Sequence, residues 1–386
     1  MLVAYVVTAA GAFTRSFVNL TNVRLGFDRD DVVVAQLAMP WAKFAGSGGI
    51  DRFTLLLDQL MTATKAVPGV VAVAVAATPP YSGTAGWDAL PSVEGQTEAE
   101  RARQPWVNME IVTASYFETL GVPLVRGRLL ASTDRQGTVP VAVVNATMAR
   151  RYWPDGDALG KRFWLGAASD SLAPRYTVVG VVGDMRYREL TTGVPSFYLP
   201  NTQYDRTAPT WFVVRGTRST EALVAPLRRA FASVDADASV LTARTMDDYL
   251  AGPLAGPRFG ATLLATFAAV ALLLVAVGIY AVIGEYVRQS RRDLGIRLAL
   301  GAQALDLVRL VVRIALQPIA IGLALGIPVA LAWARIVPPR LYEVSPTDPG
   351  TLIVVIAIMI GVAAAASVLP ARFAARLNPA DVLREH

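Results

Sequence analysis

The chain has 386 residues, of which 54% are hydrophobic and 17% charged, and its mean hydropathy is +0.43. Soluble globular proteins usually contain about 45–50% apolar and about 25% charged residues, so the composition favours a membrane protein. The net charge of +6 comes with arginines that flank apolar stretches, which is typical of membrane topology and not of nucleic-acid binding. There is no cysteine, and the single histidine is the last residue, His386. Disulfides, thiol nucleophiles and zinc–thiolate sites are therefore excluded, and neither histidine catalysis nor a histidine metal site is indicated.

The chain begins with the apolar stretch Met1 to Phe13, which has no basic residue before it. It is a poor match to a secretory signal peptide, because it lacks both a basic start and a clear small-residue cleavage site. We interpret residues 1–20 as the outer part of a membrane-spanning helix whose first half is missing.

Residues 21–257 have the composition of a soluble domain with strand and helix patterns. Two strand–helix–strand series predict an α+β domain built from β-α-β units. The first series is 32–38, 50–66 and 70–76, and the second is 211–215, 220–234 and 240–243. Between them we expect an inserted subdomain at about 106–205, with strands at 141–144 and 176–182 and a helix at 146–152. Residues 82–105 are polar and contain glycine and proline, which predicts an exposed loop.

Three long uncharged stretches follow, and they predict transmembrane helices at 258–284, 314–335 and 350–371. Each exceeds the roughly 20 residues that cross the hydrocarbon core, and three such stretches so close together argue against buried helices of a soluble core. The spans carry no intramembrane acid or base, which disfavours ion or proton coupling. Small residues that could allow close helix packing occur at Gly322, Gly326 and Gly361.

The arginines decide the expected orientation. They concentrate in the loop 285–313 and in the tail 372–386, whereas the loop 336–349 has Arg340 beside Glu343 and Asp348. By the positive-inside rule, the basic loop and the tail face the cytoplasm, and the domain 21–257 lies in the periplasm or at the cell surface. This predicts a multi-pass protein of the bacterial inner membrane.

Enzyme motifs are missing from the sequence. The stretch Gly156 to Lys161 has too few residues between its glycines for a phosphate-binding loop, and Arg162 stands where Ser or Thr would bind magnesium. No GxGxxG, HExxH or GxSxG pattern occurs. We therefore expect no catalytic, cofactor-binding or metal site, no cofactor, and no enzymatic activity of the chain's own.

Several motifs together give a family resemblance. Gly278-Ile-Tyr-Ala-Val-Ile and the run Arg291 to Ala302 resemble the cytoplasmic loop of FtsX-like/MacB-like ABC transporter permeases. Ser345 to Pro349 and the ending Leu369 to Arg384 are similar to the same family. The domain before the spans resembles a MacB-like periplasmic core domain, through Gly26-Phe27, Pro68 to Val70, Tyr116 to Val122, Arg126 to Arg128, Val144-Asn145, Gly160-Lys161, Val179 to Asp184 and Tyr198 to Pro200.

The resemblance implies four spans, an external domain after the first, an ABC ATPase partner on the cytoplasmic side, and a second permease unit as a homodimer or a fused half. The chain is similar to the C-terminal unit of a double-length permease. Its departures are the incomplete first span and Asp293-Leu294-Gly295, where the family usually has Glu-Ile-Gly. The residues implied to couple the ATPase to the permease are Arg291, Arg292, Asp293, Leu294, Gly295, Ile296, Arg297, Leu298, Ala299 and Gly301.

Two functions remain open at this point. The first is an ABC permease that couples ATP hydrolysis by a separate subunit to a change of the external domain, for export or mechanotransmission. We expect apolar Leu294, Ile296, Leu298 and Leu300 to dock into a groove of the ATPase, and the nearby arginines to meet acidic rims or lipid headgroups. The alternative is a non-transporting signalling protein that regulates a periplasmic partner such as a cell-wall hydrolase. The sequence does not indicate a substrate.

Overall fold

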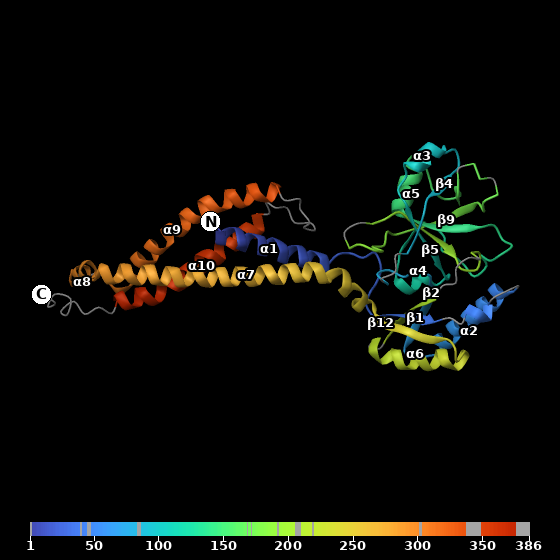
Figure 1. Cartoon of the computed structure of the whole chain (residues 1–386), viewed down its shortest axis with the longest axis horizontal. Helices are drawn as coiled ribbons and strands as arrows, with labels where there is room; N and C mark the ends of the chain where they lie inside the picture. Colours follow the sequence, from blue (N-terminus) through green and yellow to red (C-terminus); the bar gives the residue numbers. More distant parts are fainter. Residues whose placement is uncertain are drawn as a thin grey trace. The chain divides into compact units, whose positions relative to one another are not determined.

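The computed structural model describes residues 2–38, 41–44, 48–82, 86–167, 169–170, 172–190, 193–204, 210–217, 220–300, 303–336 and 349–375. The chain divides into two compact units. One unit, here called the external domain, is Val23–Pro253, and the other, here called the helical unit, combines Met1–Asn22 with Leu254–His386. Figure 1 shows the external domain as strands flanked by short helices, and the helical unit as long helices alone.

The external domain contains a ferredoxin-like lobe made of the first and last strands of the domain. Its strands lie in the order β12-β1-β11-β2, and each is antiparallel to its neighbours. All six predicted elements are present, but the two β-α-β units are interleaved, because β11 lies between β1 and β2. The elements are β1 (Val32–Ala38), the 3₁₀ helix η1 (Trp41–Phe44), α2 (Gly49–Lys65), β2 (Val70–Ala76), β11 (Trp211–Gly216), α6 (Thr220–Val234) and β12 (Ser239–Thr245).

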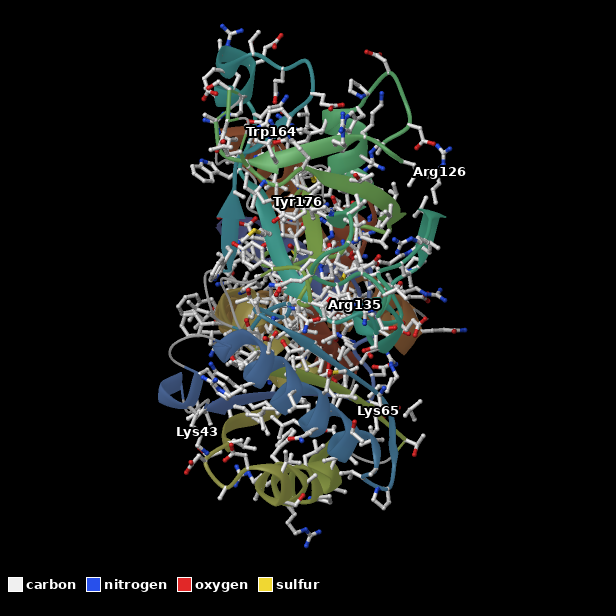
Figure 2. The ribbon with its side chains drawn as sticks, turned by 90° about the vertical axis from the view of Figure 1, so that its right-hand side faces the viewer. Lys43, Lys65, Arg126, Arg135, Trp164 and Tyr176 are labelled. Carbon is white, nitrogen blue, oxygen red and sulfur yellow. The ribbon has the colours of Figure 1, made fainter. Side chains whose placement is uncertain are left out.

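The core of this lobe lies between the sheet and the helices α2 and α6. Leu57 and Leu60 of α2 are 0% exposed, and the rings of Phe212 in β11 and Phe231 in α6 pack edge to face at 4.9 Å. These positions recur at helical spacing in α2 and at every second residue in β11, so each element turns one face toward this core. Figure 2 shows Lys43 and Lys65 at this end of the domain and Trp164 toward the other end.

An inserted lobe lies between β2 and β11 in the chain. Its mixed sheet has the order β5-β10-β7-β9-β8-β4, with β10 parallel to β5 and β7 parallel to β9. The predicted helix at 146–152 and the strands at 141–144 and 176–182 are confirmed as α5, β7 and β9. The elements are β3 (Trp87–Ala89), β4 (Pro91–Val93), α3 (Glu98–Ala102), β5 (Val107–Val112), α4 (Tyr116–Leu120), β6 (Leu124–Gly127), β7 (Val141–Asn145), α5 (Ala146–Tyr152), β8 (Arg162–Leu165), β9 (Tyr176–Val182) and β10 (Ser196–Pro200).

The stretch 82–105 differs from its prediction as a loop. It contains β3, β4 and the capped helix α3, so the inserted lobe starts directly after β2 and not near residue 106. The reason is tertiary pairing, because β3 pairs with β5 and β4 pairs with β8, far away in the chain. Strands of three residues are too short to show a period, so local composition could not reveal them.

The two lobes meet where β2 lies beside β5 and where α4 contacts β2 and β11. β2 and β5 form a single residue pair, Ala76 with Val112, and the contact is extended by the amide of Thr113, which donates to the carbonyl of Val75 at 2.9 Å. The hydroxyl of Thr113 in turn accepts from the amide of Val75 at 2.9 Å. Helix α4 lies at this junction in Figure 1.

The helical unit contains α1 (Leu2–Thr21), the part of α7 (Met246–Gln289) from Leu254 on, α8 (Arg291–Ala299), α9 (Ala304–Ile336) and α10 (Pro349–Ala375). Among the described residues, two helices are long and apolar enough to cross a membrane, namely α7 and the part of α9 from Asp306 to Val329. The apolar segment Leu352–Val368 of α10 is shorter. The expected set of three complete spans and one truncated span therefore stays a prediction.

The apolar surface of α7 and α9 distinguishes them from helices of a soluble core. Only 11% of the most apolar window of α7 and 24% of that of α9 is buried within the chain. Leu273 and Leu274 of α7 are 65% and 67% exposed. Apolar surface of this extent is typical of helices that face lipid or a partner.

Candidate functional site: the short helix between α7 and α9

The residues predicted to couple to a partner form a short helix of their own. α7 ends at Gln289, and α8 starts after a turn in which the amide of Leu294 donates to the carbonyl of Ser290 at 3.0 Å. The first turn of α9 is stabilised by a hydrogen bond from the amide of Gln303 to the carboxylate of Asp306 at 3.2 Å. The predicted cytoplasmic loop 285–313 is therefore largely helical, and α8 lies at one end of α7 (Figure 1).

Leu294 holds α8 against the bundle. It is 2% exposed and belongs to one apolar cluster with Ile283 and Val287 of α7 and with Leu307 and Val311 of α9. The sequence predicts Leu294 as a docking residue, but the structure places its side chain inside the helical unit. Leu294 can thus affect a partner only through the position of α8.

Other predicted coupling residues face outward. Ile296 is 42% and Leu300 is 82% exposed, and Arg291, Arg292, Asp293 and Arg297 are exposed as well. These positions, on α8 and at Leu300 directly after it, combine apolar, basic and acidic side chains. Such a surface suits an apolar groove with an acidic rim.

The arginines of α8 differ from those of the neighbouring helices. Arg288 pairs with Glu285 in α7, and Arg309 pairs with Asp306 in α9 at 3.7 Å. Within the described part of the chain, no carboxylate pairs with Arg291, Arg292 or Arg297. Their charges are therefore available to a partner or to lipid headgroups.

A cavity of about 450 Å³ adjoins the start of α8. Most of its wall belongs to α7, and Pro370 of α10, far away in the chain, completes it, so no single stretch of sequence indicates it. Its lining residues are Tyr280, Ala281, Gly284, Glu285, Val287, Arg288, Arg291 and Pro370.

The remaining predicted site residues are placed only in part. Gly295, Leu298 and Ala299 lie in α8, without a described side-chain environment, and Gly301 lies outside the described residues. Gly326 is buried in α9. A Cβ atom added at Gly322 or Gly361 would meet no described atom within 4 Å outside its own stretch of helix.

Comparison with known families decides the class of the protein. The profile of the MacB-like periplasmic core domain matches residues 2–230, and that of the FtsX-like permease C-terminal domain matches residues 265–379. The chain belongs to the FtsX-like/MacB-like ABC transporter permease family. The predicted resemblance is thus confirmed, and membrane localisation and a role in transmembrane transport follow from the family. Its members are permeases and generally not catalytic themselves.

Two curated relatives share the name "Macrolide export ATP-binding/permease protein MacB". The protein from Chromobacterium violaceum is 26% identical over 314 residues, which cover 77% of this chain and 46% of the relative. The protein from Hahella chejuensis is 23% identical over 293 residues, which cover 72% of this chain and 43% of the relative. The chain thus spans less than half the length of these relatives.

Solved structures of external domains resemble part of the chain. The periplasmic region of MacB from Actinobacillus actinomycetemcomitans is 14% identical, with a TM-score of 0.39, and the match covers 58% of this chain and 92% of that structure. The extracellular domain of the transporter YknZ from Gram-positive bacteria is 13% identical, with a TM-score of 0.36, and the match covers 55% and 99%.

Proposed function

We propose that the chain is the permease unit of an ABC transporter in which a separate ATPase on the cytoplasmic side moves α8 and thereby changes the external domain. The proposal depends mainly on one observation, that one side of α8 is buried in the helical unit and the opposite side is exposed. Leu294 is 2% exposed and fixes α8 to α7 and α9, whereas Ile296 and Leu300 point away from them. A partner that binds the outer side would therefore move the helices that hold the inner side.

The helix α7 supplies a mechanical connection. It runs from Met246, next to β12, to Gln289, two residues before α8. Its 44 residues correspond to about 66 Å at about 1.5 Å per residue. Pro253 and Pro257 lie near its first turns, and each lacks the amide hydrogen that a helix interior uses. This part of α7 is therefore the weakest point along the connection and suits a hinge.

The proposed partners follow from the relatives. Both curated relatives are named as ATP-binding and permease proteins, whereas this sequence contains no phosphate-binding motif. We assign ATP binding to a separate cytoplasmic subunit, and export or mechanotransmission to the complex. A second permease unit, as a homodimer or a fused half, is proposed to pack at Gly322 and Gly361, where small residues allow close approach.

Binding of an ABC ATPase from the same genome to the full chain in detergent tests the proposal. Ile296→Ala and Leu300→Ala should each weaken binding roughly tenfold, which corresponds to about 1.4 kcal/mol. Arg297→Ala should mainly slow association and reduce its dependence on salt. Leu325→Ala is the matched control. Leu325 is also apolar and exposed, but it lies in α9 away from α8, so its replacement should leave binding unchanged.

The proposal also predicts a different behaviour for Leu294. Leu294→Ala should lower the thermal stability of the helical unit, since it removes a buried side chain from the cluster between α7 and α9. If the joint replacement of Ile296, Arg297 and Leu300 by alanine leaves ATPase binding unchanged, α8 is not the coupling element.

A further inference from the structure

A buried carboxyl group lies at the junction of the two lobes of the external domain. Glu110 is in the middle of β5 and is 0% exposed. One of its carboxylate oxygens accepts from the amide of Thr78 at 2.6 Å, and the other accepts from the hydroxyl of Tyr187. Thr78 follows β2 of the ferredoxin-like lobe, and Tyr187 follows β9 of the inserted lobe. Glu110 therefore connects segments that lead into both lobes.

The surroundings of Glu110 are aromatic and contain no counter-charge. The hydroxyls of Tyr116 in α4 and Tyr198 in β10 are buried and have no hydrogen-bond partner among the described residues. Glu110 acts electrostatically on both tyrosines, and Tyr198 is its neighbour in the β5–β10 pairing. The rings of Tyr116 and Tyr198 lie 6.3 Å apart.

The charged groups nearby are used elsewhere. Arg188 donates to Asp88 at 2.8 Å and to Asn108 at 3.0 Å, and Arg186 acts on Tyr81. Asp184, which acts on Tyr198, accepts from Thr147 at the start of α5. Among the described residues, no arginine or lysine forms an ion pair with Glu110.

The chemistry of this site favours the neutral carboxyl. Burial raises the pKa of Glu110 to about 8, although the hydrogen bonds from Tyr187 and Thr78 work in the opposite direction. Burial also raises the pKa of Tyr116 and of Tyr187 well above the usual value, so neither hydroxyl ionises first. A carboxylate without a counter-charge is stable only if water reaches it. Water can enter if β5 and α4 separate from the segment after β2.

The junction of β2 with β5, here called the seam, has the fewest paired residues among the strand pairs of the described sheet. β2 and β5 share one residue pair, whereas β1 and β11, for example, share five. Separation of β5 from β2 breaks the backbone hydrogen bonds of Ala77 to Ile111 and of Thr113 to Val75, and it exposes Glu110. A proton that binds more tightly to the closed state will shift the population toward that state.

We propose that Glu110 is a proton-operated latch between the two lobes of the external domain. With a neutral Glu110 the lobes stay joined at the seam, and with an ionised Glu110 the seam opens and admits water. This latch lies within the external domain, and its test does not depend on whether α8 couples to an ATPase.

The absence of cysteine makes a direct test simple. Spin labels at Gln59→Cys in α2 and Arg151→Cys in α5 report the distance between the lobes in the otherwise cysteine-free full chain in lipid nanodiscs. As the pH is raised from about 6 to about 9, a longer distance should appear in pulsed electron–electron double resonance. Opening releases the proton, so the transition should be complete by the pKa of Glu110 in the closed state, about 8, and its midpoint should lie below that value.

Three variants distinguish the latch from general alkaline loosening. Glu110→Gln should keep the short distance throughout, since an amide cannot ionise. Glu118→Gln, at an exposed glutamate of the adjacent α4, is the matched control and should keep the wild-type transition. Tyr187→Phe removes a donor to the carboxylate, so the transition should move to higher pH.

Two results would overturn the latch, and one variant remains informative if another fails to fold. A wild-type distance that is constant over the pH range, or a transition that persists in Glu110→Gln, overturns the latch. If Glu110→Gln fails to fold, Tyr187→Phe decides, because an unchanged midpoint or one at lower pH contradicts a carboxyl group that titrates beside this hydroxyl.

Discussion

Phenylalanine has opposite surroundings in the two units of the molecule. In the external domain, Phe117, Phe212 and Phe231 are 0% exposed, whereas Phe259 and Phe267 of α7 are 69% and 55% exposed. Burial of apolar surface from water is favourable by about 25 cal/mol per Å². An exposed ring would forfeit that gain in water, but in lipid the solvent itself is apolar. The external domain therefore depends on its core, and the helical unit depends on its surroundings.

Charge follows the same division. The stretch 258–284 carries no charge after Arg258, whereas the external domain encloses Glu110 and Asp134 at 0% and 6% exposure. A buried polar group is tolerated where hydrogen bonds compensate it, and both carboxyl groups accept at least two. The protein's buried titratable chemistry thus lies outside the predicted spans.

The comparison is tested most strongly by truncating matched phenylalanines. Phe212→Ala should lower the free energy of unfolding of the external domain by about 3–5 kcal/mol, because it leaves a cavity beside Phe231. Phe267→Ala, on the exposed side of α7, should cost about 1 kcal/mol or less. Urea denaturation of the full chain in detergent, followed by tryptophan fluorescence, measures both. Equal effects of the two truncations would mean that α7 is packed as a soluble core helix.

A charge placed on each surface tests the comparison from the other side. Leu273→Arg should reduce membrane insertion by about 2.5–3.5 kcal/mol, the cost of a charge at the centre of a spanning helix. Leu241→Arg, at a 58% exposed position of β12, should leave insertion and folding nearly unchanged. The membrane-bound fraction after sedimentation and alkaline extraction is the measurement. If Leu273→Arg inserts at the wild-type level, this part of α7 does not lie in the hydrocarbon core.

Local patterns predicted elements well and their arrangement poorly. The predicted strand at 32–38 and helix at 220–234 match β1 and α6, because alternation and helical spacing are properties of neighbouring residues. The position of β11 between β1 and β2 depends on pairs such as Val33 with Val214, whose partners are far apart in the chain. No window of sequence contains both partners.

In the candidate site, helical spacing separates residues that the sequence groups together. Leu294, Ile296, Leu298 and Leu300 are predicted to dock together, yet they are spaced by two residues. On a helix, residues four apart share a side, so Ile296 and Leu300 face one way while Leu294 lies on another face. Their exposures of 42%, 82% and 2% agree with that geometry. A helical projection of the sequence would have separated them.

The position of Glu110 could not be predicted from alternation. In Val107-Asn-Met-Glu-Ile-Val112, polar residues alternate with apolar ones, which indicates a strand with one face in water. All six residues are buried, because other elements cover both faces of β5. Burial on the polar face comes from α4 and from the segment around Tyr187, which the strand's own sequence does not contain.

The smallest predicted effect concerns Asp134, a buried carboxylate that has an arginine partner, whereas Glu110 has none among the described residues. Asp134 accepts two hydrogen bonds from the guanidinium of Arg128, at 2.8 and 2.9 Å, and one from the amide of Ala131 at 2.9 Å. Burial tends to raise the pKa of Asp134, but these hydrogen bonds outweigh it and leave the pKa below its usual value. Asp134 therefore stabilises the fold above its unfolded pKa of about 3.9, and this contribution is lost as the pH falls through the lower folded value.

Replacement of Asp134 by asparagine should consequently weaken the domain at neutral pH and make it less sensitive to acid. The loss at neutral pH should be about 1–2 kcal/mol, because charge-assisted hydrogen bonds contribute about 1.5–3 kcal/mol and water around the half-exposed Arg128 screens part of this. Urea denaturation at neutral pH and below about pH 4 measures the difference, which should shrink on acidification. Asp155→Asn, at an exposed turn, is the control. A difference that persists unchanged in acid would show that Asp134 acts through shape and not through its charge.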